Sequence, residues 1–180
     1  DATDNDEIYF VPTIESFLIA NNKPLYFEAR IKYAEGATDD NNVILGWIST
    51  GAANTLIDDG GGPVASATMA VIYKIDGGTV WRCRSQIGAA VGKTDTVSDD
   101  TAGGTSYEVM GVEVLPYSST KAKIIYTKDG NPLRDSTGKA ITHDLTYTNA
   151  VAMGPIIGVK NGSGTAEVMN CDYVAAYQVR

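Results

Sequence analysis

The segment from Leu25 to Tyr33 alternates strictly between apolar and polar side chains. Leu25, Phe27, Ala29, Ile31 and Tyr33 fall on one side of an extended chain, and Tyr26, Glu28, Arg30 and Lys32 fall on the other. Successive side chains of a strand point to opposite faces, so this period predicts a strand with one face on a core and one face in water. Such one-sided strands are typical of antiparallel sheets.

Similar short segments recur along the chain, and turn residues separate them. Asp76-Gly77-Gly78 and Asp129-Gly130 are strong hairpin signals because these residues tolerate the positive φ of tight turns. In one hairpin strand Trp81, Cys83 and Ser85 share a face, and Arg82, Arg84 and Gln86 share the other. The other expected strands are 8–11, 14–20, 43–49, 67–74, 79–87, 107–115, 122–128, 151–160 and 166–179.

About ten to twelve short strands with regular turns predict an all-β, two-sheet antiparallel sandwich or jelly roll. We expect one domain over residues 1–180. The only weak helix signal lies near 145–153, which disfavours a parallel α/β fold. Residues 51–63 and 89–104 are polar and glycine-rich, and we interpret 51–63 as a long surface loop. Pro132 cannot donate a ladder hydrogen bond, so its strand is predicted to be short or at an edge.

The chain carries 22 acidic and 14 basic side chains, a formal charge of -8. This charge disfavours nonspecific binding to nucleic acid or anionic membranes and favours a partner with a basic surface. No apolar run approaches the roughly twenty residues that span a bilayer. Cys83 and Cys171 lie in strand-like segments and lack metal-ligand spacing, so we expect buried free thiols, with disulfide pairing as the alternative.

Motifs for nucleotide binding and for histidine-dependent catalysis are weak. The segment 88–94 resembles a phosphate-binding loop but has three residues between its glycines instead of four, and no helix signal follows it. His143 is the only histidine, which excludes a paired-histidine metal site. No nucleophile-elbow motif accompanies it, so we interpret His143 as a turn or surface residue beside Asp144.

Carboxylates could serve glycan cleavage or cation binding. Glu108 and Glu113 are five residues apart on one strand, which places them on opposite faces and argues against a catalytic pair. The loop segments 39–42 and 58–59 are the best candidates for a bound calcium ion, although Asp and Asn also favour turns for local reasons. We assign no catalytic, cofactor-binding or metal-binding residue. Tyr26 and Tyr117 are candidates for stacking on sugars or for anchoring an interface.

Three segments resemble the concanavalin-like jelly rolls, a group that includes laminin-G-like domains, legume-type lectins and laminarinase-type glycoside hydrolases. Residues 26–32 are similar to an early strand of that fold, 123–133 to its hairpin ending in Asp-Gly, and 170–180 to its closing strand. The order of 4–7, the Phe27 strand, Asp129-Gly130 and the 172–180 segment more narrowly resembles virion proteins of tailed bacteriophages. The consecutive Glu, Asp and Glu pattern of the glycanases is absent.

The resemblance implies a noncatalytic structural protein that decorates or stabilises a bacteriophage capsid at the particle surface. Its partner would be the major capsid protein or another virion protein, and by analogy it would form a trimer. The resemblance implies no cofactor. The resemblance also implies a further strand or arm before Asp1. The alternative is a carbohydrate-binding module or receptor-recognising adhesin with a glycan as ligand, and a degenerate glycanase is a third interpretation.

Overall fold

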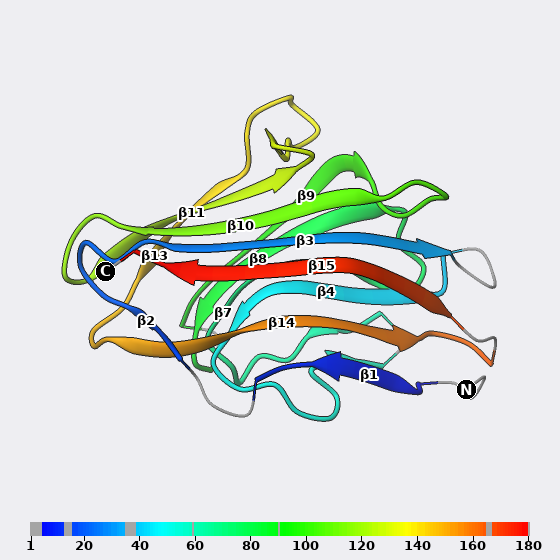
Figure 1. The fold of residues 1–180 in the computed structure, drawn as a ribbon, viewed down its shortest axis with the longest axis horizontal. Coiled ribbons are helices and arrows are strands. Elements are labelled where there is room, and N and C mark those ends of the chain that lie inside the picture. The colour runs from blue at the N-terminus through cyan, green and yellow to red at the C-terminus, as the bar shows by residue number, and fades with distance from the viewer. Residues whose placement is uncertain are drawn as a thin grey trace.

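The protein is an antiparallel β-sandwich in the computed structural model, which describes residues 5–12, 16–34, 39–58, 60–89, 91–164 and 167–179 (Figure 1). The described residues contain no helix, so no helix of that part of the chain could cross a membrane. The predicted all-β, two-sheet architecture is confirmed. The weak helix signal near 145–153 was wrong, because this segment contains the end of one strand and the beginning of another.

The larger sheet has seven strands in the order β1-β14-β4-β7-β8-β9, and β2 also pairs with β14. Its strands are β1 (Glu7–Phe10), β2 (Phe17–Ile19), β4 (Asn41–Ile48), β7 (Met69–Lys74), β8 (Val80–Ile87), β9 (Val91–Thr101) and β14 (Val151–Asn161).

The smaller sheet has six strands in the order β12-β11-β10-β3-β15, and β13 also pairs with β11. Its strands are β3 (Leu25–Ala34), β10 (Glu108–Pro116), β11 (Lys121–Lys128), β12 (Asn131–Pro132), β13 (Thr142–Thr146) and β15 (Val168–Gln178). A separate two-stranded ladder joins β5 (Leu56–Ile57) to β6 (Gly62–Pro63).

The main hydrophobic core lies between the two large sheets. The predicted apolar face of β3 is buried there, and Phe27 packs edge-on against Trp47 with ring centroids 6.2 Å apart. The indole Nε1 of Trp47 donates a hydrogen bond across the sandwich to the carbonyl of Val112 at 3.2 Å. The polar tip of this large buried ring is therefore satisfied, as burial requires.

Both predicted hairpins are present. Gly77 has a φ of 69° in the turn from β7 to β8, and Asp129 and Gly130 have φ of 51° and 75° between β11 and β12. Pro132 lies in the two-residue edge strand β12, as its missing donor requires. On β8, Trp81, Cys83 and Ser85 are buried toward the main core, which confirms the predicted division of faces.

Two segments differ from the sequence-based interpretation. Residues 51–63 are not a simple surface loop, because they contain the β5–β6 ladder and bury Leu56 against the sandwich. The polar segment 89–104 contains the eleven-residue edge strand β9. Its inward positions include Thr96 and Ser98 instead of apolar residues, so the hydrophobic period that marks a strand is missing.

Candidate functional site

The outer face of the seven-stranded sheet is covered by the chain itself. Leu56 and Ala67, from the segment between β4 and β7, pack on Met69, Val71 and other buried residues of that face and form a second hydrophobic cluster. This surface is the outer wall of a second, smaller core. Two pockets on this side have volumes of about 170 and 230 Å³, one lined in part by Val11 and Gly51 and the other by Thr50 and Ala67.

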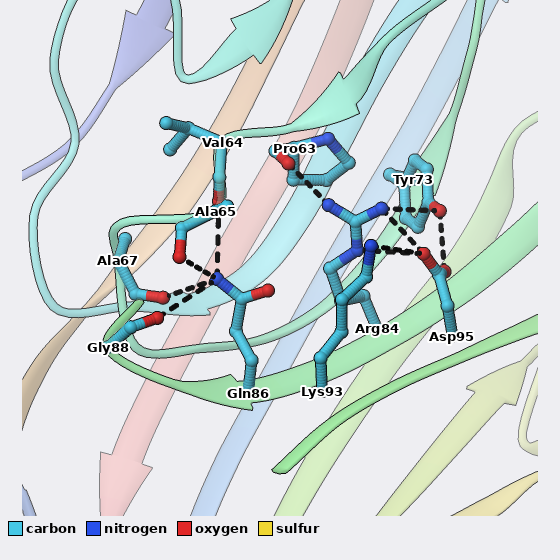
Figure 2. A network of polar contacts seen from close by, with 10 residues as sticks. All are labelled: Pro63, Val64, Ala65, Ala67, Tyr73, Arg84, Gln86, Gly88, Lys93 and Asp95. Atoms are coloured by element: carbon cyan, nitrogen blue, oxygen red, sulfur yellow. Dashed lines mark hydrogen bonds and ion pairs between the residues drawn. The ribbon is translucent and has the colours of Figure 1, made fainter. Parts of the chain in front are cut away.

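Arg84 fastens this covering segment to the sheet (Figure 2). Its guanidinium donates to the carbonyl of Pro63 and forms an ion pair with Asp95, with Nε 3.0 Å from Oδ2. The hydroxyl of Tyr73 donates to the same carboxylate at 2.6 Å, and burial together with this hydrogen bond raises the pKa of Tyr73. The charges of Arg84 and Asp95 therefore neutralise each other, and Arg84 holds the covering segment against the sheet.

Gln86 adds a second attachment beside Arg84 (Figure 2). Its side-chain Nε2 lies within hydrogen-bonding distance of four backbone carbonyls: Val64 at 3.2 Å, Ala65 at 3.0 Å, Ala67 at 2.7 Å and Gly88 at 3.4 Å. Because Gln86 is fully buried, a smaller side chain at this position would remove these contacts from the interior. Arg84 and Gln86, both predicted on this face of β8, therefore attach the covering segment to the sheet.

The outer face of the six-stranded sheet is open in the described structure, and tyrosines gather on it. Tyr26 of β3 and Tyr177 of β15 pair across the strands, and their rings stack with centroids 5.0 Å apart and an interplanar angle of 18°. Because β15 is the edge strand, one ring face of Tyr177 packs on Tyr26 while the other points beyond the sheet. Tyr177 is 56% exposed, so this second ring face is available for stacking.

An open hollow of about 550 Å³ lies on the same outer face, over β10, β11 and β13. It is lined by Leu115, Tyr117, Lys123 and Asp144. The Tyr117 ring is 55% exposed, and its hydroxyl lies 3.4 Å from Oδ1 of Asp144. The hollow therefore combines an aromatic ring with a carboxylate and an ammonium group. We call the surface over Tyr26, Tyr177 and this hollow the tyrosine face.

Charged groups continue the surface along β3 and β15. Arg30 forms an ion pair with Asp172, and its guanidinium carbon lies 4.4 Å from the ring centroid of Tyr107. The ammonium of Lys32 lies 5.1 Å from the same ring. The hydroxyl of Tyr173 donates to Glu28. Rings and hydrogen-bonding groups thus alternate over much of this face.

Sequence reasoning found only part of this arrangement. Tyr26 and Tyr117 were recognised as candidates, and the structure places both on one face. Tyr177 was missed as the partner of Tyr26, although its position in the alternating closing segment could have suggested it. Asp144 and Lys123 were missed because they are far apart in sequence and become neighbours only through the pairing of β11 with β13.

His143 was predicted at a turn or on the surface, and this was wrong. It lies on β13 and is buried between the sheets, with Nδ1 3.0 Å from the hydroxyls of both Ser85 and Tyr126 and Nε2 3.0 Å from Oγ1 of Thr96. Burial lowers the pKa of His143 to about 4. A neutral imidazole can both donate and accept, so His143 joins the two sheets through hydroxyl groups. The Ser85 hydroxyl is fully buried and unavailable as a nucleophile.

The prediction that Glu108 and Glu113 lie on opposite faces of one strand is confirmed. Glu108 points inward, where the indole Nε1 of Trp81 donates to it at 3.3 Å and Lys128 forms an ion pair at 2.7 Å. Glu113 is paired with Tyr26 and lies on the outer face. The two carboxylates cannot flank one bond.

Both candidate calcium loops are engaged by lysines. Lys74 is buried, and its ammonium donates to the carbonyls of Asp39 and Asn41, each at 2.8 Å. The ammonium of Lys160, also buried, contacts Asp58, Glu7 at 3.4 Å, Oδ1 of Asn54 at 2.8 Å and the carbonyl of Leu56 at 3.1 Å. Asp59 lies outside the described residues. Among the described residues, no group of three His, Cys, Asp or Glu side chains is placed to hold a metal ion.

The remaining sequence candidates have structural positions. Residues 91–94 of the segment resembling a phosphate-binding loop lie in β9, so the segment leads into a strand instead of the helix that a phosphate cradle requires. Cys83 and Cys171 are both free thiols. Cys83 is buried as expected, and burial raises its pKa. The expectation of a buried thiol was wrong for Cys171, which is exposed on the edge strand β15.

No protein-family model and no curated protein matches this chain. Solved structures do match it. The Emp47p carbohydrate recognition domain has a TM-score of 0.62 at 7% identity, with 98% of this chain and 80% of that chain covered. A legume lectin-like domain from Entamoeba histolytica has a TM-score of 0.61 at 7% identity, covering 99% and 81%. Alginate lyase AlyC3 has a TM-score of 0.62 at 10% identity, covering 98% and 73%.

These similarities establish the fold as a lectin-like, concanavalin A-like jelly roll, which confirms that part of the sequence resemblance. The fold is shared by carbohydrate recognition domains and by enzymes that act on glycans. At such low identity it fixes neither the ligand nor an activity. The comparisons lend no support to a bacteriophage virion role, which stays a prediction.

Proposed function

We propose that this chain is a noncatalytic carbohydrate-binding domain whose ligand lies on the tyrosine face. The observation that carries the proposal is the hollow beside Tyr117, where an exposed ring adjoins the Asp144 carboxylate and the Lys123 ammonium. Sugar rings present C–H groups that pack on aromatic faces and hydroxyls that bind carboxylates and ammonium groups. A shallow site with aromatic stacking and a few polar groups meets both requirements.

The other large face supports this choice by elimination. The segment between β4 and β7 covers the outer face of the seven-stranded sheet, and the Arg84 and Gln86 contacts hold it there. A glycan would have to displace that segment and expose an apolar cluster. The tyrosine face requires no such rearrangement.

The names of the similar structures support glycan recognition as the ligand class, since they include a carbohydrate recognition domain and an alginate lyase. The positions of Glu108 and Glu113 argue against hydrolysis by this pair, because a glycanase needs two carboxylates across one bond. The proposal therefore favours the carbohydrate-binding alternative over the virion role. A capsid partner and a trimer stay predictions, and a glycan-binding domain could also be carried on a particle.

A glycan array followed by calorimetric titration tests the proposal. Tyr117→Ala should weaken binding of the best oligosaccharide at least about fivefold, because one stacked ring contributes on the order of 1–2 kcal/mol. Phe10→Ala is the matched control, since Phe10 is 62% exposed but lies on β1. Absence of binding across the array, or equal loss in both variants, would refute the site.

A degradation assay separates binding from catalysis. Incubation with a panel of β-glucans and uronate polysaccharides should release neither new reducing ends nor unsaturated products. Turnover that survives Tyr117→Ala would show an enzyme acting elsewhere on the chain.

A further inference from the structure

The two sheets of the sandwich differ in width, and β1 has no strand of the other sheet opposite it. β3 packs over β4, β10 over β4 and β7, and β13 over β8 and β9. Continuing this order leaves β1, at the edge of the seven-stranded sheet, without a strand of the six-stranded sheet opposite it. Figure 1 shows β14 and β1 extending beyond β15 in the lower part of the view.

The inward face of β1 consequently exposes large apolar side chains. Ile8 is paired with Val159 and Phe10 with Ile157, and directly paired residues share a face. Ile157 belongs to the main core, so Ile8 and Phe10 point toward the side of the six-stranded sheet. Even so, they are 72% and 62% exposed. Two neighbouring large side chains on a core face normally lie under a covering element.

The edge of β15 that faces this gap is open in its first part, whereas at its far end the side chain of Gln178 hydrogen-bonds the backbone of Leu18 on β2. In the described structure β15 pairs with β3 alone, over ten residue pairs from Val168 to Gln178. Its inward residues Met169, Val174 and Ala176 are only partly buried against the core. A long edge strand with unpaired backbone groups is a template for another strand. Adjacent strands lie about 4.8 Å apart and packed sheets about 10 Å apart, so a strand added to β15 would cover the side of the larger sheet toward which Ile8 and Phe10 point.

One end of this gap is acidic. A cavity of about 310 Å³ lies there, lined by Asp6, Glu7, Ile8, Val159, Asn161 and Glu167. Oδ2 of Asp6 is buried and has no hydrogen-bond donor among the described residues. Glu7 already contacts Lys160, whereas Asp6 forms no ion pair with any residue the structure describes. A basic side chain on the incoming strand would therefore be complementary at this end.

A second copy of the chain does not fit the gap through its own β15. The larger sheet of the second copy would extend beyond its β15, as Figure 1 shows for the first copy, and would need the space that β14 and β1 of the first copy occupy. A single strand without an attached sandwich has no such conflict. The geometry thus selects a free extended segment.

We propose that β15, Ile8 and Phe10 form an acceptor groove that binds an extended arm of another protein by β-strand addition. The arm pairs its backbone with the free edge of β15 and directs alternate apolar side chains onto Ile8 and Phe10. A Lys or Arg of the arm lies beside Asp6. The groove faces the interior side of the sheet whose outer side is the tyrosine face, and this proposal does not depend on glycan binding.

A short synthetic peptide of alternating valine and threonine with a terminal lysine tests the groove. Fluorescence anisotropy should show saturable binding, and hydrogen exchange should slow in residues 168–176. The same peptide with N-methylated backbone amides should bind at least tenfold more weakly, because it cannot complete the ladder. Replacing the terminal lysine by glutamate should also weaken binding, and binding that ignores both changes would overturn the proposal.

Variants locate the binding on the chain. Phe10→Asp should reduce peptide affinity at least tenfold, and Ile8→Asp serves the same purpose if Phe10→Asp does not fold. Val97→Asp is the matched control, since Val97 is 48% exposed on β9, the edge strand at the other side of the larger sheet. The proposed occupant would be contradicted if Phe10→Asp and Val97→Asp had equal effects, or if the wild-type chain did not bind the peptide. It would also be contradicted if light scattering showed a wild-type dimer that Phe10→Asp dissociates.

Discussion

Tyr177 stacks on Tyr26 across the edge of the six-stranded sheet, at 5.0 Å between ring centroids and nearly parallel. The pair joins the closing strand to the first strand of that sheet and leaves one tyrosine ring face open to solvent. Stacked aromatic pairs contribute about 0.5–1.5 kcal/mol beyond their buried area. The same contact therefore serves both the sheet and the proposed site.

Tyr177→Leu should separate these two roles. Because Tyr177 is 56% exposed, the substitution should lower the free energy of unfolding by no more than about 1 kcal/mol, while glycan affinity falls at least fivefold. Urea denaturation and calorimetric titration of the same preparation provide both values. A large loss of stability with unchanged affinity would make the stack purely structural.

His143 should make the fold sensitive to mild acid. Its pKa is about 4 in the folded chain and near 6.5 when exposed, so the unfolded state binds the proton more tightly. Stability from the neutral form is complete above pH 6.5 and is lost as the pH falls toward 4. Between pH 7 and pH 5 the loss is about 2 kcal/mol.

His143→Gln is the control for this pH dependence, since its amide keeps hydrogen-bonding capacity without titrating. The difference in unfolding free energy between wild type and His143→Gln should narrow by about 2 kcal/mol on going from pH 7 to pH 5. A constant difference would show that His143 does not remain neutral in the folded core.

Asp95→Asn should loosen the segment that covers the seven-stranded sheet. The substitution removes the negative partner of buried Arg84 and is expected to cost about 2 kcal/mol. Hydrogen exchange should quicken in residues 62–68 before it does so elsewhere. Asp99→Asn, at an exposed position on the same strand, should stay within about 0.5 kcal/mol of wild type.

Lys160→Met tests whether an ammonium group holds the β5–β6 ladder. The variant leaves Glu7 and Asp58 without their shared cation, and we expect a loss of about 3 kcal/mol in unfolding free energy. Lys93→Met, which removes a half-exposed ammonium 3.7 Å from Asp95, should cost less than about 0.5 kcal/mol. Similar losses in the two variants would argue against a special role for Lys160.

The strands that sequence could predict are those with one apolar and one wetted face. β3 is the clearest case, since every apolar residue from Leu25 to Tyr33 is buried. β9 was not predicted because its inward residues are polar. Thr96 is hydrogen-bonded to His143, and the hydroxyl of Ser98 donates to Asp100. Their partners lie far away in sequence or within a polar run, so no hydrophobic period marks the strand.

The candidate site was predictable only where a single residue carried the signal. Tyr26 and Tyr117 are recognisable as tyrosines with polar surroundings, whereas the hollow requires the register that sets Lys123 opposite Asp144. His143 shares a face with Leu145 on β13, and that spacing could have indicated burial. The exposed inward face of β1 could not be predicted, because it arises from the unequal width of two sheets.

Amide chemical-shift mapping of the labelled protein, titrated with the oligosaccharide that binds best, tests the central claim most directly. Binding at the tyrosine face predicts shifts concentrated at Tyr26, Leu115, Tyr117, Asp144 and Tyr177. Shifts concentrated at residues 49–68 together with Tyr73 and Asp95, or no shifts with any glycan, would contradict it.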